Sequence, residues 1–325
     1  MHYNGPIIRP HTEANDLFVE VTVGCTHNSC TFCNFYHGYP FRMAPLEQVE
    51  ADLQEARRYT DDPGRIWASG GNPYAMSTER LAELGRLFKK YFPNTPLATY
   101  ARVDDLNRKT VEEMQYLRDF GWDDLVIGIE SGDDDVLRHV NKGYTAADIL
   151  EGCRRLEQAG VRYRVIYLGG LAGKGHGIET AHRTAVLLNQ LHPYYLFLTT
   201  VSVLPGTELY EERARGEFVE MGERERLDEL ITLLDKMKND IRVFQVPNTT
   251  WITFDIDLQK EKADVLPQLR RMAYLLQMCS NNLNQYAKVA NENGQIYTAD
   301  LEDLRARLDE LISVSKQILA KLTEL

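Results

Sequence analysis

The chain has 325 residues, of which 43% are hydrophobic and 26% are charged, an ordinary composition for a globular protein. Its formal net charge of -11 argues against general affinity for nucleic acid or for anionic membranes. No stretch approaches the roughly 18 consecutive apolar residues of a membrane-spanning helix, and no apolar leader precedes the first strand, so we expect a cytoplasmic protein with no membrane partner.

Short β-branched or aromatic runs alternate with longer stretches of helical period from residue 17 to about 215. This alternation is typical of repeated βα units around a parallel sheet. Six units predict an α/β fold with a partial (β/α)6 barrel, whose active-site groups lie at the carboxyl ends of the strands. A doubly wound open sheet has the same periodicity and is the structural alternative. The predicted strands are 17–23, 65–71, 97–102, 124–130, 162–168 and 195–201, and the predicted helices are 45–59, 77–92, 110–120, 145–159 and 178–191.

The pattern changes after residue 201. A charged helix is predicted over 223–240, a strand with a Pro-Asn turn over 243–257, and helix from about 262 onwards. Near the end, leucine or isoleucine recurs at three-to-four spacing, with an interruption at Ser315, which predicts an amphipathic packing or coiled-coil stripe. The residues of that stripe are Leu301, Leu304, Leu308, Leu311, Ile318 and Leu322.

Three of the five cysteines, Cys25, Cys30 and Cys33, fall within nine positions directly after the first predicted strand. The other two, Cys153 and Cys279, are isolated, so the set is a poor disulfide framework and reduced thiols are expected. Three thiolates from one loop can ligate three irons of a [4Fe–4S] cluster and leave the fourth iron open for chemistry.

Two other interpretations of these thiols stay open. A zinc site of the Cys3His type needs a fourth ligand, which His27 or His37 could supply. A redox-active pair formed by Cys30 and Cys33 is less favoured, because the surrounding sequence has no thioredoxin-like arrangement.

Several segments together resemble a known family. The segments are "GCTHNSCTFCNFYHGYPFR" (24–42), "SGGNP" (69–73), "GIESGDDDVLRHVNKG" (128–143), "HRTAVLLN" (182–189) and "LPGTELY" (204–210). They resemble the radical SAM superfamily, and more closely its branch with the Elp3/MiaB/NifB-type domain, over about 17–245. The chain differs from the commonest cysteine spacing of that family, C-x3-C-x2-C, by one extra residue in the first gap.

The resemblance implies a fold, cofactors and a reaction. It implies a radical SAM barrel with a [4Fe–4S] cluster on Cys25, Cys30 and Cys33, and S-adenosylmethionine (SAM) bound to the open iron through its amino and carboxylate groups. It further implies reductive cleavage of SAM to methionine and a 5′-deoxyadenosyl radical, which abstracts hydrogen from a small or cofactor-like substrate. The electron would come from a donor such as flavodoxin or ferredoxin. The alternative function is a cluster- and SAM-binding carrier without turnover, as in haem-chaperone relatives.

The resemblance also assigns SAM contacts to the strand ends. The amino group of SAM would meet acceptors at Gly70 and Gly71, where the backbone can approach closely, and at Asn72, where related families often have Glu. The ribose hydroxyls would meet Glu130 and Ser131 at the end of the fourth predicted strand.

The remaining SAM contacts need a cation and an apolar surface. Arg102 and Arg183 are the candidates for the cofactor carboxylate, and the adenine would lie against Phe32 and the backbone around 204–205.

Each of these candidate residues also has an alternative, purely structural interpretation. The glycine pair could be only a tight turn, and Glu130 could be a solvated loop acid or a helix-terminal acid. Arg102 could form a structural ion pair with Asp104 or Glu130.

The tail from about 264 no longer resembles the enzyme family. It resembles the helical C-terminal part of relaxosome accessory proteins that assist plasmid mobilisation, above all in "NNLNQYAKVANENGQIY" (281–297). Residues 260–325 hold about as many acidic as basic side chains, so no electrostatic signature of DNA binding is present. The net charge of the chain argues against nucleic acid as a partner of the core, and the question stays open for the tail.

We accordingly divide the chain into a lead-in (1–16), a radical SAM core (17–245), a connecting strand or linker (246–263) and a helical extension (264–325). Our hypothesis is that a mobile-element reading frame has become joined to a slightly shortened enzyme, which predicts that a chain ending near 262 still folds. A third functional interpretation, a zinc-stabilised accessory protein of DNA mobilisation, leaves 17–245 unexplained.

Overall fold

The computed structural model of the protein describes residues 1–13, 15–246, 252–293 and 298–323. The strands are β1 Leu17–Glu20, β2 Thr22–Val23, β3 Arg42–Met43, β4 Ile66–Ser69, β5 Leu97–Ala101, β6 Asp124–Glu130, β7 Arg162–Gly169, β8 Tyr195–Thr200, β9 Arg242–Gln245 and β10 Phe254–Asp257. The α-helices are α1 Leu46–Ala56, α2 Thr78–Tyr91, α3 Val103–Asn107, α4 Val111–Asp119, α5 Asp134–His139, α6 Ala146–Ala159, α7 Gly177–Leu188, α8 Glu208–Arg215, α9 Glu223–Lys236, α10 Leu258–Asn293 and α11 Thr298–Thr323. Two short 3-10 helices are His11–Glu13 and Pro73–Ala75.

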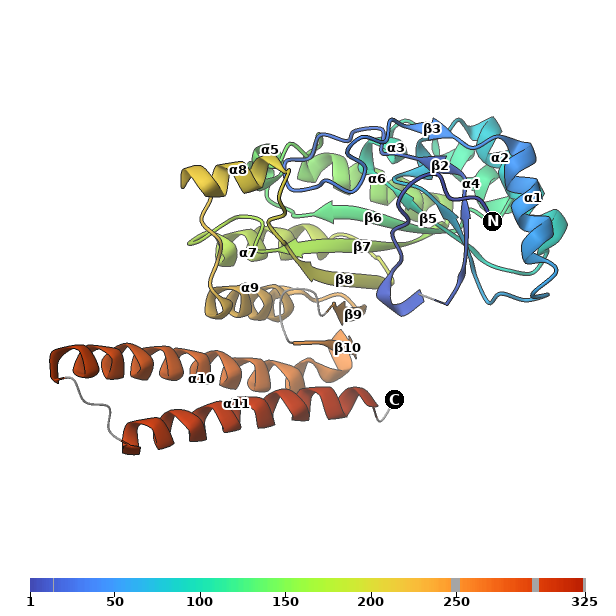
Figure 1. The fold of residues 1–325 in the computed structure, drawn as a ribbon. Coiled ribbons are helices and arrows are strands. Elements are labelled where there is room, and N and C mark those ends of the chain that lie inside the picture. Colours follow the sequence, from blue (N-terminus) through green and yellow to red (C-terminus); the bar gives the residue numbers. More distant parts are fainter. Residues whose placement is uncertain (14, 247–251, 294–297, 324–325) are drawn as a thin grey trace.

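One sheet of eight strands organises the molecule, in the order β1-β4-β5-β6-β7-β8-β9-β10 (Figure 1). Every neighbouring pair from β1 to β9 is parallel, and β10 alone runs antiparallel, against β9. The strands between β1 and β8 alternate with helices, as the six predicted βα units require. The prediction of an α/β fold with a mostly parallel sheet is thus confirmed, and within the described residues β1 and β10 are the two edges of the sheet, as the predicted partial barrel requires.

The two faces of the sheet have different neighbours. On one face, alternate strand residues such as Val19, Leu125 and Val165 belong to the large core that the helices complete. On the other face, Phe18 and Trp67 stack with ring centroids 5.7 Å apart within a smaller aromatic cluster. A strand buried on both faces reads as a continuous apolar run, which is why the strands were recognisable in the sequence.

Local signals fix where the helices begin and end. The Ser77 hydroxyl accepts a hydrogen bond from the Arg80 amide at the start of α2, and Thr110 and Thr145 open α4 and α6 with reciprocal capping boxes. Gly160 ends α6 in the left-handed conformation, at φ 68°. The helix boundaries predicted from these capping residues lie within a few residues of the observed ones.

Two features of the sheet differ from the prediction. The single strand predicted over 243–257 is a pair of strands, β9 and β10, and this pair extends the sheet beyond the sixth unit. The predicted Pro-Asn turn lies outside the described residues. The antiparallel pair β2 and β3 was missed, because β3 is only two exposed residues long and has no apolar pattern.

The tail is a helical hairpin that packs onto the rest of the protein. Leu269 and Met272 of α10 are fully buried in the main core. The Lys262 ammonium donates to the backbone carbonyls of Asp235 and Met237, both at 2.7 Å, at the end of α9. Although α10 and α11 are long, neither they nor any other described helix is apolar enough to cross a membrane. The boundary predicted at 264 falls inside α10, which is continuous from residue 258.

We expect α10 to contribute to the stability of the whole protein. Leu269→Ala should lower the free energy of unfolding by about 2–5 kcal/mol, because it leaves a cavity in a packed core. The matched control is Leu283→Ala on the same helix, where half of the side chain is exposed and the expected change is within about 0.5 kcal/mol. Urea unfolding curves measure both. Equal, small effects would mean that the tail is a separate appendage, as our joining hypothesis requires.

Candidate functional site at the cysteine loop

The cysteine loop connects β2 to β3 and packs against the end of β4. The Gly71 amide donates to the Gly24 carbonyl at 3.1 Å. A Cβ at Gly71 would lie 2.3 Å from that carbonyl oxygen, and one at Gly24 would lie 2.6 Å from the Tyr39 carbonyl oxygen. Gly24 also has φ 79°, a conformation that side chains disfavour. Gly71 at the end of β4 and Gly24 at the start of the loop therefore let the two segments approach each other closely.

All three cysteines of the loop are free and half-buried. Burial raises the pKa of the Cys33 thiol, and the neighbouring Cys30 adds to the effect. The backbone hydrogen bond with Phe35 and the charge of Lys142 act on the Cys33 pKa in the opposite direction. The Arg102 guanidinium Nη1 lies 4.0 Å from the Cys30 sulfur. Within the described residues no three His, Cys, Asp or Glu side chains converge as ligands of one ion would. Ligands of separate irons in a cluster do not need to converge in this way.

Two backbone hydrogen bonds tie the middle of the loop to the carboxyl end of the sheet. The Thr31 amide donates to the Val140 carbonyl at 3.1 Å, just after α5, and the Leu209 amide of α8 donates to the Thr31 carbonyl at 2.9 Å. The Asn34 amide group also donates to the Pro205 carbonyl at 3.2 Å. The predicted adenine-binding stretch around 204–205 therefore does lie beside the cysteine loop.

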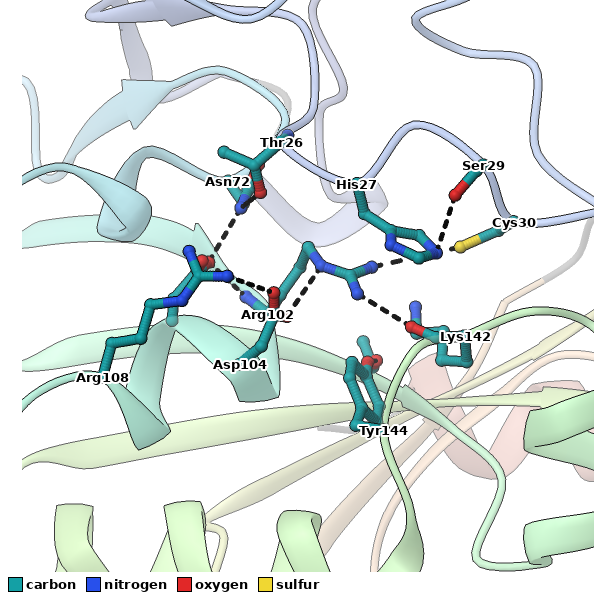
Figure 2. A network of polar contacts seen from close by, with 12 residues as sticks. Thr26, His27, Ser29, Cys30, Asn72, Arg102, Asp104, Arg108, Lys142 and Tyr144 are labelled. Atoms are coloured by element: carbon teal, nitrogen blue, oxygen red, sulfur yellow. Dashed lines mark hydrogen bonds and ion pairs between the residues drawn. The ribbon is translucent and has the colours of Figure 1, made fainter.

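The histidines offered as a fourth zinc ligand differ in their surroundings. His27 Nε2 lies 2.6 Å from the Asn141 carbonyl oxygen and 3.1 Å from the Ser29 hydroxyl (Figure 2). Burial lowers the pKa of His27, which favours the neutral ring. His37 is exposed. The His27 ring thus packs the loop against the turn that follows α5.

Asn72 joins the loop to the two neighbouring strand ends (Figure 2). Its carbonyl oxygen accepts from the Thr26 amide at 3.0 Å, and its amide group donates to the Thr26 hydroxyl at 2.7 Å and to Asp105 at 2.9 Å. Asp105 also accepts from the Arg102 amide at 2.9 Å. Because the fully buried Asn72 side chain is engaged at both ends, we propose that it positions the loop, while the backbone of this strand end offers the acceptors for a ligand.

Asp105 gives this network a pH dependence. Burial raises its pKa from 3.8 to about 6, against the hydrogen bonds from Arg102 and Asn72 that lower it. The folded protein holds this proton more tightly than the unfolded chain, so the stability that Asp105 contributes is complete below its unfolded pKa and is lost as the pH rises from about 4 to about 6. Asp105→Asn should remove that fall, on the order of 1–3 kcal/mol. Urea midpoints across this pH range, measured for both proteins, would refute the assignment if the two profiles were parallel.

Arg102 lies at the centre of the site (Figure 2). Its guanidinium donates to Asp104 at 2.8 Å and to the Lys142 carbonyl at 2.8 Å, and it stacks over the Tyr144 ring at 5.2 Å. The structural ion pair with Asp104 is therefore present, together with the approach to Cys30. The role of Arg102 in binding a cofactor carboxylate stays a prediction.

Lys142 is the site residue that the sequence analysis missed. Its buried ammonium donates to the Glu130 carboxylate at 2.8 Å and lies 5.8 Å from the centre of the Phe32 ring. Burial alone would lower the pKa of Lys142, but Glu130 and neighbouring groups raise it overall, so the lysine stays charged. Its position within the family-like segment 128–143, three residues after His139 closes α5, was the available signal.

Glu130 has an unusual backbone at the end of β6. Its φ is 61°, in the left-handed region that residues other than glycine seldom adopt. Such strain costs about 1–3 kcal/mol and collects at functional sites, where the surrounding structure enforces it. Here the Lys142 pair and a register shift in the pairing of β6 with β7 hold the carboxylate at the strand end.

The last two predicted residues have mainly structural contacts. The buried Ser131 hydroxyl accepts from the Asp133 amide at 3.1 Å. Arg183 on α7 pairs with Asp133 at 3.0 Å, with Asp135 at 3.4 Å and with Glu179 at 3.0 Å. The structure thus gathers Phe32, Arg102 and Glu130 around the cysteine loop, whereas the polar contacts described for Arg183 all go to α5 and to its own helix.

Two family models match the chain. The model of the radical SAM superfamily matches residues 19–188, from β1 to the end of α7. That range contains the three cysteines and every side chain of the network in Figure 2. The model of the bacterial mobilisation protein (MobC) matches residues 266–318, which form most of α10 and α11.

Similar proteins share modest sequence identity with the chain. The haem chaperone HemW of Bacillus subtilis is 23% identical over 237 residues, which cover 69% of this chain and 60% of HemW. Methylornithine synthase (PylB) has a similar structure, with TM-score 0.50 and 16% identity over 70% of this chain and 65% of that protein. Elp3 of Methanocaldococcus infernus has TM-score 0.48 and 18% identity, over 73% and 57% of the two chains. The chain spans 60% of HemW, less than two thirds of its length, and the match to methylornithine synthase supports the shared fold alone.

Proposed function

Because the chain belongs to the radical SAM superfamily, we propose that it is an iron–sulfur enzyme that reductively cleaves SAM to methionine and a 5′-deoxyadenosyl radical. The radical would abstract hydrogen from a small or cofactor-like substrate. The observation that carries the proposal is the loop with three free thiols, held at the carboxyl ends of the strands beside the buried cations Arg102 and Lys142.

We assign a [4Fe–4S] cluster to Cys25, Cys30 and Cys33. Three free thiols from one loop fit such a cluster, which would supply the electron for SAM cleavage and would have one iron without a protein ligand. The Arg102 guanidinium, 4.0 Å from the Cys30 sulfur, would stabilise thiolate charge. The hydrogen bonds of Thr31 keep the loop in place at the ends of α5 and α8.

We assign SAM to the space between the loop and the strand ends. Lys142 and Arg102 would hold its carboxylate, because both are cations buried at this point. Glu130 and Ser131 would face its hydroxyls, and Phe32 would lie against its adenine. The backbone of Gly70 and Gly71 would accept its amino group. Buried, already paired side chains would orient the cofactor and exclude water with little rearrangement.

We propose a cellular compartment and an electron donor from the chemistry of the free thiols and of the assigned cluster. All five cysteines are free, as expected in a reducing compartment such as the cytoplasm. A cluster that delivers electrons must receive them, so a flavodoxin or ferredoxin is the proposed donor.

The second candidate function is haem carriage, which the similarity to HemW favours. The two candidates predict opposite results for one anaerobic preparation. Reduced, cluster-loaded protein with SAM should release 5′-deoxyadenosine and methionine, and a haem titration should show no stoichiometric binding. Tight binding of one haem per chain without SAM cleavage would mean that the protein is a haem carrier and not an enzyme.

A further inference from the structure

Tyr36 is a buried tyrosine of the cysteine loop, three residues after Cys33. Its backbone is held in place, because its carbonyl accepts from the Tyr39 amide at 2.9 Å and from the Asn28 side-chain amide at 3.0 Å. The phenol oxygen is buried as well, but no group among the described residues forms a hydrogen bond with it. A buried hydroxyl without a partner destabilises a folded chain, so its presence in this loop needs an explanation.

The titratable groups that act on this hydroxyl are two thiols and one carboxylate. Burial raises the pKa of Tyr36, and the charges of Cys25, Cys33 and Glu20 raise it further. The Glu20 carboxylate is already engaged, since it accepts three hydrogen bonds from residues 4–5, at 2.7, 2.8 and 3.1 Å. The two thiols are free. The acceptors that remain beside the hydroxyl are therefore the sulfur atoms.

An unpartnered buried hydroxyl does not by itself indicate a ligand, as Tyr74 illustrates. Tyr74 is fully buried, and its phenol oxygen also has no hydrogen-bond partner within the described part of the chain. Burial raises the pKa of Tyr74, and the carboxylates of Glu113 and Asp105 add to the effect, whereas no described cysteine does so. Tyr36 differs because its hydroxyl lies in the loop that carries the assigned cluster ligands.

A cluster in this loop would give the hydroxyl an acceptor. Hydrogen bonds to the sulfur atoms of an iron–sulfur cluster are one of the factors that set its reduction potential. Reduction adds negative charge to the cluster, and a hydrogen bond becomes stronger when its acceptor is more negative, so a donor stabilises the reduced form more than the oxidised form. A tyrosine carries its proton at neutral pH and can therefore be that donor.

We propose that the Tyr36 hydroxyl donates a hydrogen bond to a sulfur on the Cys25 and Cys33 side of the cluster, and that this bond raises the reduction potential of the cluster. Tyr36 is then a tuning residue, which makes the electron easier to accept and has no contact with the substrate. The inference rests on the proposed function in one respect only, namely that the loop holds a cluster, and it is independent of SAM cleavage.

The first test is a redox titration of the full, cluster-loaded chain, followed by electron paramagnetic resonance. Tyr36→Phe removes one oxygen atom and keeps the ring that fills the core. Its equilibrium constant for reduction should fall about tenfold, which lowers the midpoint potential of a one-electron couple by about 59 mV. The control Tyr74→Phe also removes a buried, unpartnered hydroxyl and should keep the wild-type potential. An unchanged potential in Tyr36→Phe, or equal shifts in both variants, would overturn the inference.

A second measurement detects the hydrogen bond itself. Electron–nuclear double resonance of the reduced wild type should show a proton coupling that disappears in D2O. The same coupling should be missing in Tyr36→Phe and present in Tyr74→Phe, and its survival in Tyr36→Phe would overturn the inference. A wild type without iron would refute the cluster assignment and this inference together. A loaded Tyr36→Phe with wild-type potential and intact SAM cleavage would refute the inference and leave the proposed function standing.

Discussion

Cys30→Ala is expected to abolish SAM cleavage and to leave less than a full cluster on the protein. Cys30 is one of three thiols in the loop, and its sulfur lies 4.0 Å from the Arg102 guanidinium. With two cysteines left, the loop has too few ligands to hold three irons. The measurements are iron and sulfide content after anaerobic purification, and 5′-deoxyadenosine released after reduction.

The control for this variant is Cys279→Ala. Cys279 is a free cysteine of α10, outside the loop, and its replacement should leave iron content and SAM cleavage unchanged. If Cys30→Ala kept the full cluster and activity, the loop would not be the cluster site. If both variants lost iron together, general misfolding and not ligand loss would be the cause.

The second large effect is expected at Lys142. Lys142→Met alone would leave the Glu130 carboxylate buried without its partner, which typically costs about 3–5 kcal/mol. The informative variant therefore removes both charges, as Lys142→Met/Glu130→Gln. We expect it to fold and to load its cluster, but to need SAM at least a hundredfold more concentrated, about 2.7 kcal/mol of lost binding.

Lys109→Met is the matched control for Lys142. Lys109 is equally buried, but its ammonium donates to the carbonyls of Tyr74 and Met76, away from the cysteine loop. This control should lose stability and keep the wild-type KM for SAM. An unchanged KM in the double variant would show that the buried pair is structural and does not bind the cofactor.

The fold was largely predictable because its strands carry a local signal. Strands buried on both faces read as apolar runs, and caps such as Thr145 and Gly160 mark helix ends within a few residues. The Pro-Asn turn indicated a reversal within 243–257, but the pairing of β9 with β8 and of β10 with β9 was not predicted, because a local pattern does not say which strands are neighbours in a sheet. The helix α10 is continuous through the predicted boundary at 264, and it packs against α9, a contact between distant segments that no local pattern encodes.

The candidate site was predictable only in part. The cysteine spacing indicated the loop, and Arg102 and Glu130 were predicted because each lies at the end of a strand. Lys142 was missed because a lysine just after a short helix usually lies in solvent, and only the tertiary structure buries it beside Glu130. The engagement of Asn72 with Thr26 and Asp105 was hidden for the same reason, since its partners are distant in the sequence.

The central claim is that the cysteine loop holds a cluster with one iron open to SAM. Its most direct test is metal and sulfide analysis of anaerobically purified protein, followed by electron paramagnetic resonance of the reduced protein with and without SAM. The account predicts about four irons per chain and a signal that changes when SAM is added. One zinc per chain, with no iron signal and no response to SAM, would contradict it.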